Sequence, residues 1–229
     1  EEKVPAFFSI MSGPLEEKKV PIFHLVHIIL SNIKDEILWN ELKNKFNISE
    51  NIDEMSAIYS YEKNIYRRYN KYVLNLFLDE EISREFLEGK IQQIYGSLST
   101  FIEKFYISPK EIIEMYKNGM EIGVHCVHHR PYSGNAQSFY DNEIKPCKEY
   151  LANLIGEDPK WYVPAFGGGE NTQEMLNELT PILIQNGFKG GFTTIEGYCN
   201  FSNNDFWHNR VDCNKLEQFL EKEGIIFET

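Results

Sequence analysis

Hydrophobic positions along the first half of the chain follow two different patterns. Residues 4–11 (Val-Pro-Ala-Phe-Phe-Ser-Ile-Met) form a short continuous apolar run that is closed by Ser12-Gly13-Pro14, which predicts a buried strand followed by a turn. Between residues 21 and 105 the apolar positions instead recur at helical spacing, so this part of the chain is expected to be a helical block. The helices predicted there cover residues 21–30, 35–46, 66–78, 80–88 and 97–106.

From residue 108 onward, helical and strand patterns alternate. Ser108, Pro109 and Glu111 form a capping box that predicts the start of a helix, and Gly119 ends it. The elements expected next are a strand ending near residue 125, a helix over 138–155, a strand over 161–166, a helix over 172–186, strands over 187–195 and 206–211, a helix over 214–223 and a last apolar segment over 224–227. This alternation indicates a parallel α/β sheet or barrel, with functional residues at the carboxyl ends of the strands.

The strongest candidate for a functional site is the stretch of residues 120–131, which contains three of the six histidines. Its sequence is Met-Glu-Ile-Gly-Val-His-Cys-Val-His-His-Arg-Pro. His125 and His129 are four positions apart, a separation of about 13 Å on a strand but only about 6 Å on a helical or turn-like segment. If the two rings meet, the strand must end near His125 and the chain must turn. Two converging imidazoles would form half of a site for a divalent metal, most simply zinc, because a complete site needs at least one more ligand.

The histidine spacing alone leaves two interpretations open. A pair at this spacing can also arise by chance in a chain with six histidines, and its members would then only stabilise a turn. His128 is expected to pack against its neighbours or to face solvent, and Cys126 to be a small core residue. Two other features, the segment Phe166-Gly-Gly-Gly169 and Arg210, also fall near predicted strand ends. The histidine pair and these two features all lie near predicted strand ends, which favours a functional site at the carboxyl edge of the sheet.

Composition and charge narrow the class of protein. With 229 residues, 42% of them hydrophobic, the chain can bury a sizeable core in one large domain or two small ones. The net charge of −12 argues against nucleic acid or an anionic membrane surface as a partner, since both would be repelled. No apolar run reaches the ~18 residues of a membrane span, and the start of the chain does not resemble a signal peptide, so a cytoplasmic location is expected. The four widely spaced cysteines indicate neither a zinc ribbon nor a redox pair.

Together these segments resemble the polysaccharide deacetylase family, the NodB-homology fold of carbohydrate esterase family four. Residues 121–131 are similar to its histidine motif, in which a strand ending in Glu-Ile-Gly is followed by His-x-x-x-His. The resemblance implies that His125 and His129 are metal ligands. Residues 187–212 resemble the segment in which an arginine, here Arg210, orients the catalytic base.

A third motif of the family, aromatic-x-Pro-x-aromatic-Gly, forms one wall of the substrate groove. Tyr162-Val-Pro-Ala-Phe-Gly167 resembles it, which implies that Tyr162, Pro164, Phe166 and Gly167 bind substrate.

The resemblance also implies a fold and a reaction. The expected fold is a deformed (β/α) barrel in which residues 1–229 form a single domain, with a helical insertion at 21–105. The expected activity is metal-dependent hydrolysis of N- or O-acetyl groups on a polysaccharide or glycan precursor, with zinc as the metal. The metal polarises the acetyl carbonyl and activates a water, and a carboxylate takes the proton of that water.

One motif of the family has no counterpart in the sequence. An Asp-Asp pair supplies the third metal ligand and the catalytic base, and it lies on a first strand just upstream of the segment that matches residues 4–8. No Asp-Asp occurs in this chain. We therefore expect either a deacetylase that lacks its first strand by N-terminal truncation or a relative without a complete site. The alternative function is a catalytically inactive, carbohydrate-binding domain.

Overall fold

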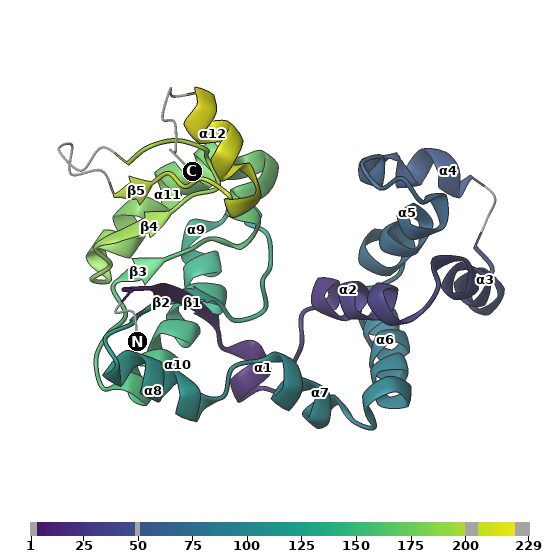
Figure 1. The fold of residues 1–229 in the computed structure, drawn as a ribbon, viewed down its shortest axis with the longest axis horizontal. Helices are drawn as coiled ribbons and strands as arrows, with labels where there is room; N and C mark the ends of the chain where they lie inside the picture. Colours follow the sequence, from purple (N-terminus) through teal and green to yellow (C-terminus); the bar gives the residue numbers. More distant parts are fainter. Residues whose placement is uncertain (1–3, 49–50, 200–205, 223–229) are drawn as a thin grey trace. The chain divides into compact units, whose positions relative to one another are not determined.

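The chain folds into two compact units in the computed structural model, which describes residues 4–48, 51–199 and 206–222 (Figure 1). Unit 1 combines the N-terminal segment up to Glu17 with the chain from Ile107 onward, and unit 2 comprises Lys18–Tyr106. Unit 2 covers nearly the same residues as the helical insertion expected from the sequence. The division into one domain with an insertion stays a prediction.

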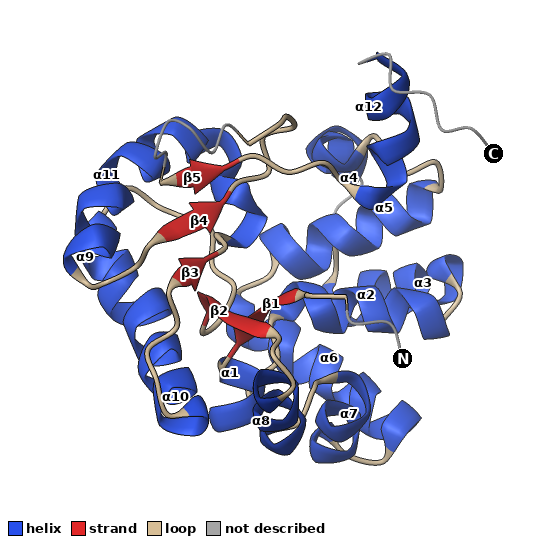
Figure 2. Ribbon diagram, turned by 60° about the vertical axis from the view of Figure 1, so that its left-hand side comes forward, coloured by secondary structure: helices blue, strands red, loops and turns tan. Residues whose placement is uncertain are grey.

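Unit 1 is built on a parallel sheet of five strands (Figure 2). The strands are β1 (Phe7–Met11), β2 (Glu121–Cys126), β3 (Trp161–Tyr162), β4 (Gly190–Phe192) and β5 (Trp207–His208). Their order in the sheet is β1-β2-β3-β4-β5, and each strand pairs in parallel with the next. This arrangement confirms the predicted α/β fold, agrees with a deformed (β/α) barrel, and brings the carboxyl ends of the strands to one edge.

Helices lie in the connections from β1 to β2, from β2 to β3 and from β3 to β4, whereas the described residues 193–199 after β4 contain none. Unit 1 contains α1 (Gly13–Glu16), α8 (Pro109–Lys117), α9 (Ala136–Phe139), α10 (Lys145–Ile155), α11 (Thr172–Gln185) and α12 (Leu216–Lys222), together with the 3-10 segments η4 (Ala165–Asn171) and η5 (Cys213–Lys215). Helix α8 begins with the predicted capping box: Ser108 Oγ accepts from the Glu111 amide at 3.2 Å, and the Glu111 carboxylate accepts from the Ser108 amide at 2.7 Å.

The single helix predicted over 138–155 is interrupted by a π-helical turn. Between α9 and α10 lies η3 (Tyr140–Ile144), in which the Lys145 amide bonds to the Tyr140 carbonyl, five residues back. Pro146 follows at the start of α10. A proline has no N–H and its ring clashes with the carbonyl four residues before it, so a regular helical turn cannot form here and the chain widens instead.

The regular secondary structure of unit 2 is entirely helical among its described residues. It consists of α2 (Ile22–Asn32), α3 (Asp35–Phe46), α4 (Ile52–Met55), η1 (Ser56–Tyr59), α5 (Ile65–Tyr72), the π-helical turn η2 (Val73–Phe77), α6 (Glu80–Tyr95) and α7 (Leu98–Phe105). Its core gathers apolar side chains such as Leu25, Leu42 and Leu87, which are fully buried. The five predicted helical segments are confirmed, although α6 continues through Gly89 to Tyr95, and α4 was not predicted.

Strands β3, β4 and β5 are shorter than the predicted ranges 161–166, 187–195 and 206–211. Glycine is required in β4 for close packing: a Cβ on Gly190 or Gly191 would come within 2.5 Å of the Trp161 ring or 2.4 Å of the Trp207 ring. The apolar segment predicted over 224–227 lies outside the described residues. Within the described part of the chain, no helix has the length and apolar character needed to cross a membrane.

Candidate metal centre

The first histidine of the predicted pair lies on a bulge in β2. Ile10 of β1 pairs with Val124 and Met11 pairs with Cys126, so His125 is the extra residue between them. A bulge bends the strand and changes the direction of its side chains, and bulges are common next to functional sites. Strand β2 ends one residue later, at Cys126, as the histidine spacing predicted.

The second histidine reaches the first through a left-handed backbone conformation. His129 has φ +60°, which is uncommon for a residue with a side chain. Its ring meets that of His125 edge to face, with the ring centroids 4.7 Å apart. The structure therefore brings the two histidines together, as either a metal pair or a turn contact would require.

Hydrogen bonding fixes which nitrogen of His125 is available to a ligand. The Nδ1 atom of His125 lies 2.6 Å from the carbonyl oxygen of Val163, which can only accept, so Nδ1 carries the proton. Burial lowers the pKa of His125; the bond to Val163 raises this pKa and the charge of Arg210 lowers it further, with a net downward shift. A neutral ring with Nδ1–H bound to a carbonyl leaves Nε2 as a lone-pair donor, which is the usual state of a metal-ligating histidine.

The residues after β3 form one side of the histidine pair. The Phe166 ring stands perpendicular to the His129 ring, with centroids 4.5 Å apart, and half of the Phe166 side chain is exposed. Phe166 and Gly167 are both left-handed, with φ +55° and +64°. Glycine adopts this conformation readily, but for Phe166 it is unfavourable and persists only where surrounding contacts enforce it, as is common at functional sites.

The four residues expected to bind substrate differ in their exposure. Tyr162 is completely buried and packs against Phe188 and Trp207, and Pro164 and Gly167 are buried as well. Phe166 is the member of the four that offers exposed surface. A substrate-binding role for these residues stays a prediction, and Tyr162 has no surface for direct contact with a ligand in this conformation.

Arg210 follows β5 on an exposed segment. Its amide donates to the Ile195 carbonyl at 3.1 Å, and its guanidinium is close enough to His125 to lower the pKa of that ring. The charge of Arg210 thus acts on His125, the first member of the pair. Its predicted role in orienting a base is not tested by this arrangement.

The histidine pair fits half of a divalent metal site. Two imidazoles converge, and the hydrogen bond of His125 presents its Nε2 as a donor. No group of three histidine, cysteine, aspartate or glutamate side chains is placed to hold a metal ion within residues 4–48, 51–199 and 206–222. The donors are therefore the correct kind for zinc, and the described residues supply two of them.

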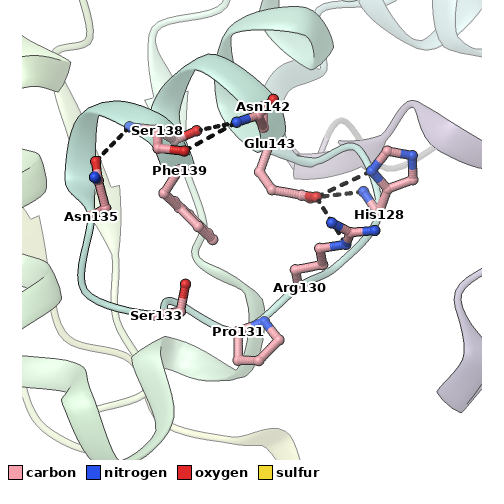
Figure 3. Close-up of a pocket in the computed structure, with 9 residues that line it drawn as sticks. All are labelled: His128, Arg130, Pro131, Ser133, Asn135, Ser138, Phe139, Asn142 and Glu143. Carbon is pink, nitrogen blue, oxygen red and sulfur yellow. Dashed lines mark hydrogen bonds and ion pairs between the residues drawn. The ribbon is translucent and has the colours of Figure 1, made fainter. Parts of the chain in front are cut away.

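A third histidine has a role that the sequence did not indicate. His128 was expected to pack or to face solvent, but its ring lies between two carboxylates, with Nδ1 3.1 Å from Glu143 and Nε2 2.8 Å from Glu17. Figure 3 shows His128 and Arg130 directed at the Glu143 carboxylate, beside a pocket of about 350 Å³. Glu143 lies in the π-helical turn η3, and Pro146 follows that turn. Pro146 is therefore the residue from which an irregular helix at Glu143 could have been expected in the sequence.

Comparisons with known proteins identify the family. The model of the family described as "Polysaccharide deacetylase" matches residues 46–182, more than half of the chain and including both histidines of the pair. No curated protein matches. Among solved structures, the chain is similar to the Streptococcus pyogenes deacetylase PplD in complex with acetate, with 23% identity, a TM-score of 0.41, and 51% of this chain and 50% of that chain covered.

A second solved structure gives a comparable match. IcaB from Ammonifex degensii is 20% identical, with a TM-score of 0.38 and with 48% of this chain and 50% of that chain covered. The chain therefore spans about half the length of the solved structures it matches. The match to the family model, which contains the His125 and His129 motif, shows that the chain belongs to the polysaccharide deacetylase family.

Proposed function

We propose that this protein is a metal-dependent carbohydrate deacetylase, a hydrolase that removes N- or O-acetyl groups from a polysaccharide or glycan precursor. Its family supports carbohydrate deacetylation as the activity. The observation that carries the metal dependence is the His125/His129 pair, with the Nδ1–H of His125 bonded to Val163 and its Nε2 left as a donor. The net charge of −12 suits a neutral or cationic glycan better than an anionic one.

In the proposed reaction, each residue of the site would have a separate role. His125 and His129 hold a divalent cation, with zinc as the proposed metal, and the Val163 carbonyl keeps His125 in the required tautomer. When bound, the cation supplies Lewis-acid activation of the acetyl carbonyl and of a water. The Phe166 ring beside His129 presents an apolar surface to the substrate, and Arg210 adds positive charge close to the pair. The carboxylate base is not among the residues assigned here.

A catalytically inactive, carbohydrate-binding domain is the second candidate. It is favoured by the lack of a three-ligand group in the part of the chain that the structure describes. Such a domain would keep the exposed Phe166 as a sugar contact and the histidines as a structural pair.

Zinc titration combined with an acetate-release assay separates these functions. Calorimetry with zinc chloride on the unsubstituted chain should show weak binding, because two ligands form an incomplete site. His125→Ala and His129→Ala should each abolish this binding while the chain stays folded. The matched control is His208→Ala, since His208 packs against Trp161 and Phe192 rather than against the pair.

Acetate release is then measured with N-acetylated and O-acetylated oligosaccharides in the presence of zinc. Release that disappears in His129→Ala supports the deacetylase. Glycan binding without acetate release supports the inactive domain. Zinc binding that is equally weak in all four proteins would show that the histidines only stabilise a turn, and the proposed metal dependence would be wrong.

A further inference from the structure

The buried residue Glu143 makes several contacts with the loop that carries His129, which is also held by Glu17 and by the Gly13 amide. The side chain of Glu143 is almost fully buried, with 2% of its surface exposed. One carboxylate oxygen accepts from the His128 amide at 2.8 Å, and the other lies 3.1 Å from His128 Nδ1. Burying a carboxylate costs several kcal/mol unless hydrogen bonds or charges compensate it, so these contacts are what allow Glu143 to be there.

The main chain of Glu143 makes a further contact with the same loop. Its carbonyl oxygen accepts from the Val127 amide at 2.9 Å. Arg130, the residue after His129, also approaches the Glu143 carboxylate, with its Nε 3.8 Å from Oε1. Figure 3 shows the side chains of His128 and Arg130, which flank His129 in the sequence, directed at the Glu143 carboxylate.

The residues that contact Glu143 flank His129, whose backbone conformation is unfavourable. A left-handed conformation costs a residue with a side chain roughly 1–2 kcal/mol, and His129 adopts it with φ +60°. The conformation turns the His129 ring toward His125. Without the contacts at positions 127, 128 and 130, the loop would be free to relax to a more common conformation and the two rings would separate.

The π-helical turn determines where the glutamate lies. Glu143 occupies the fourth position of η3 (Tyr140–Ile144), just before Pro146. A π-helical turn contains one residue more than a regular turn and therefore rotates the side chains within it, and such turns are frequent at functional sites. Here it aims a carboxylate at the loop after β2.

We propose that Glu143 is a positioning residue of the histidine site, which holds the loop of residues 127–130 so that His129 faces His125. This inference rests on the proposed function, because it assigns Glu143 to the support of the same metal pair. Residues that orient metal ligands typically change metal affinity 10- to 100-fold when they are replaced.

Two substitutions of Glu143 test the proposal. Glu143→Met keeps a similar length but removes both acceptors, and we expect it to weaken zinc binding by about tenfold or more. Glu143→Gln keeps an oxygen for the His128 amide and should recover most of that loss. Ile112→Ala is the matched control for stability, because Ile112 is fully buried in unit 1 on α8, so its truncation should lower the unfolding temperature without changing the zinc affinity of the folded protein.

Amide hydrogen exchange provides a measurement that needs no metal. In Glu143→Met the His128 amide should exchange at least about tenfold faster relative to the Val163 amide, which is bonded within the sheet to the Val124 carbonyl at 2.9 Å. In Ile112→Ala this ratio should not change.

The outcomes separate the proposals. If Glu143→Met leaves both the zinc affinity and the exchange ratio unchanged, Glu143 has no positioning role. If Ile112→Ala weakens zinc binding as much as Glu143→Met at equal loss of stability, the effect of Glu143 is general stability and the inference is overturned. If the unsubstituted chain binds no zinc, the proposed function fails, and the exchange ratio still decides whether Glu143 holds the loop.

Discussion

Gly167 lies so close to Thr194 that a single added methyl group tests the packing between them. A Cβ at this position would lie 2.0 Å from Thr194 Oγ1, 2.5 Å from Cγ2 and 2.8 Å from Cβ. Rotation of the Thr194 side chain would relieve the first two contacts, but the third involves an atom attached to the backbone. Gly167→Ala therefore requires one of the two segments to shift.

The expected magnitude has two parts. The left-handed conformation of Gly167, φ +64°, costs an alanine roughly 1–2 kcal/mol. Overpacking against Thr194 adds roughly 1–3 kcal/mol. We expect Gly167→Ala to lower the free energy of unfolding by about 2–5 kcal/mol.

Gly156→Ala measures the cost of the left-handed conformation alone. Gly156 is also left-handed, with φ +85°, but a Cβ there would have no atom within 4 Å. It should lose only the roughly 1–2 kcal/mol of the conformation. Both variants are compared by urea denaturation followed by circular dichroism.

A double substitution completes this experiment. Adding Thr194→Ala to Gly167→Ala removes Oγ1 and Cγ2, so it should recover part of the packing loss and give a coupling energy of roughly 0.5–2 kcal/mol. If Gly167→Ala is no more destabilising than Gly156→Ala, or if the two substitutions are simply additive, the inferred contact with Thr194 is wrong.

Three further substitutions test other parts of the chain. Tyr162→Phe should stabilise the protein by roughly 1 kcal/mol in urea denaturation, because the buried Tyr162 hydroxyl has no hydrogen-bond partner among the described residues; a loss of stability would indicate a partner. Leu87→Ala should cost roughly 2–5 kcal/mol, whereas Ile82→Ala on the same helix should cost about 0.5 kcal/mol or less, because Leu87 is fully buried and Ile82 is 42% exposed; equal losses would contradict the assigned core. The hydrogen bond from Lys148 lowers the pKa of Asp158, so this carboxylate stabilises the fold above its unfolded pKa of about 3.9 and the contribution is lost as pH falls through the lower folded value. The stability difference between the unsubstituted chain and Asp158→Asn should accordingly be constant near neutral pH and narrow below about pH 4, and a difference that does not depend on pH would refute this.

The elements that the sequence predicted well are those whose signals are local. The capping box at Ser108 involves three neighbouring residues, and the structure reproduces it. The apolar run at residues 4–11 and the histidine spacing likewise located β1 and the end of β2. Alternation of helix and strand indicated the parallel sheet because each crossover needs a helix.

The features that the sequence did not predict depend on partners far along the chain. The bulge at His125 exists only in the register between β1 and β2. The burial of Tyr162 results from packing against Phe188 and Trp207 on other elements. The contacts of Glu143 depend on a π-helical turn. Pro146, within an otherwise regular helical pattern, indicated that the helix is irregular there, but it did not indicate which way the side chain of Glu143 would point.

Along the chain, unit 2 lies between β1 and β2, and this order has a consequence for how the protein folds. Phe7 of β1 pairs with Glu121 of β2, and the whole of Lys18–Tyr106 separates them. Closing so long a loop is entropically unfavourable and slows the formation of distant strand pairs. Unit 2 is compact, and its helices α2 and α6 contact each other although they lie far apart in the sequence. We therefore expect β1 to pair with β2 late in folding, after unit 2 has become compact.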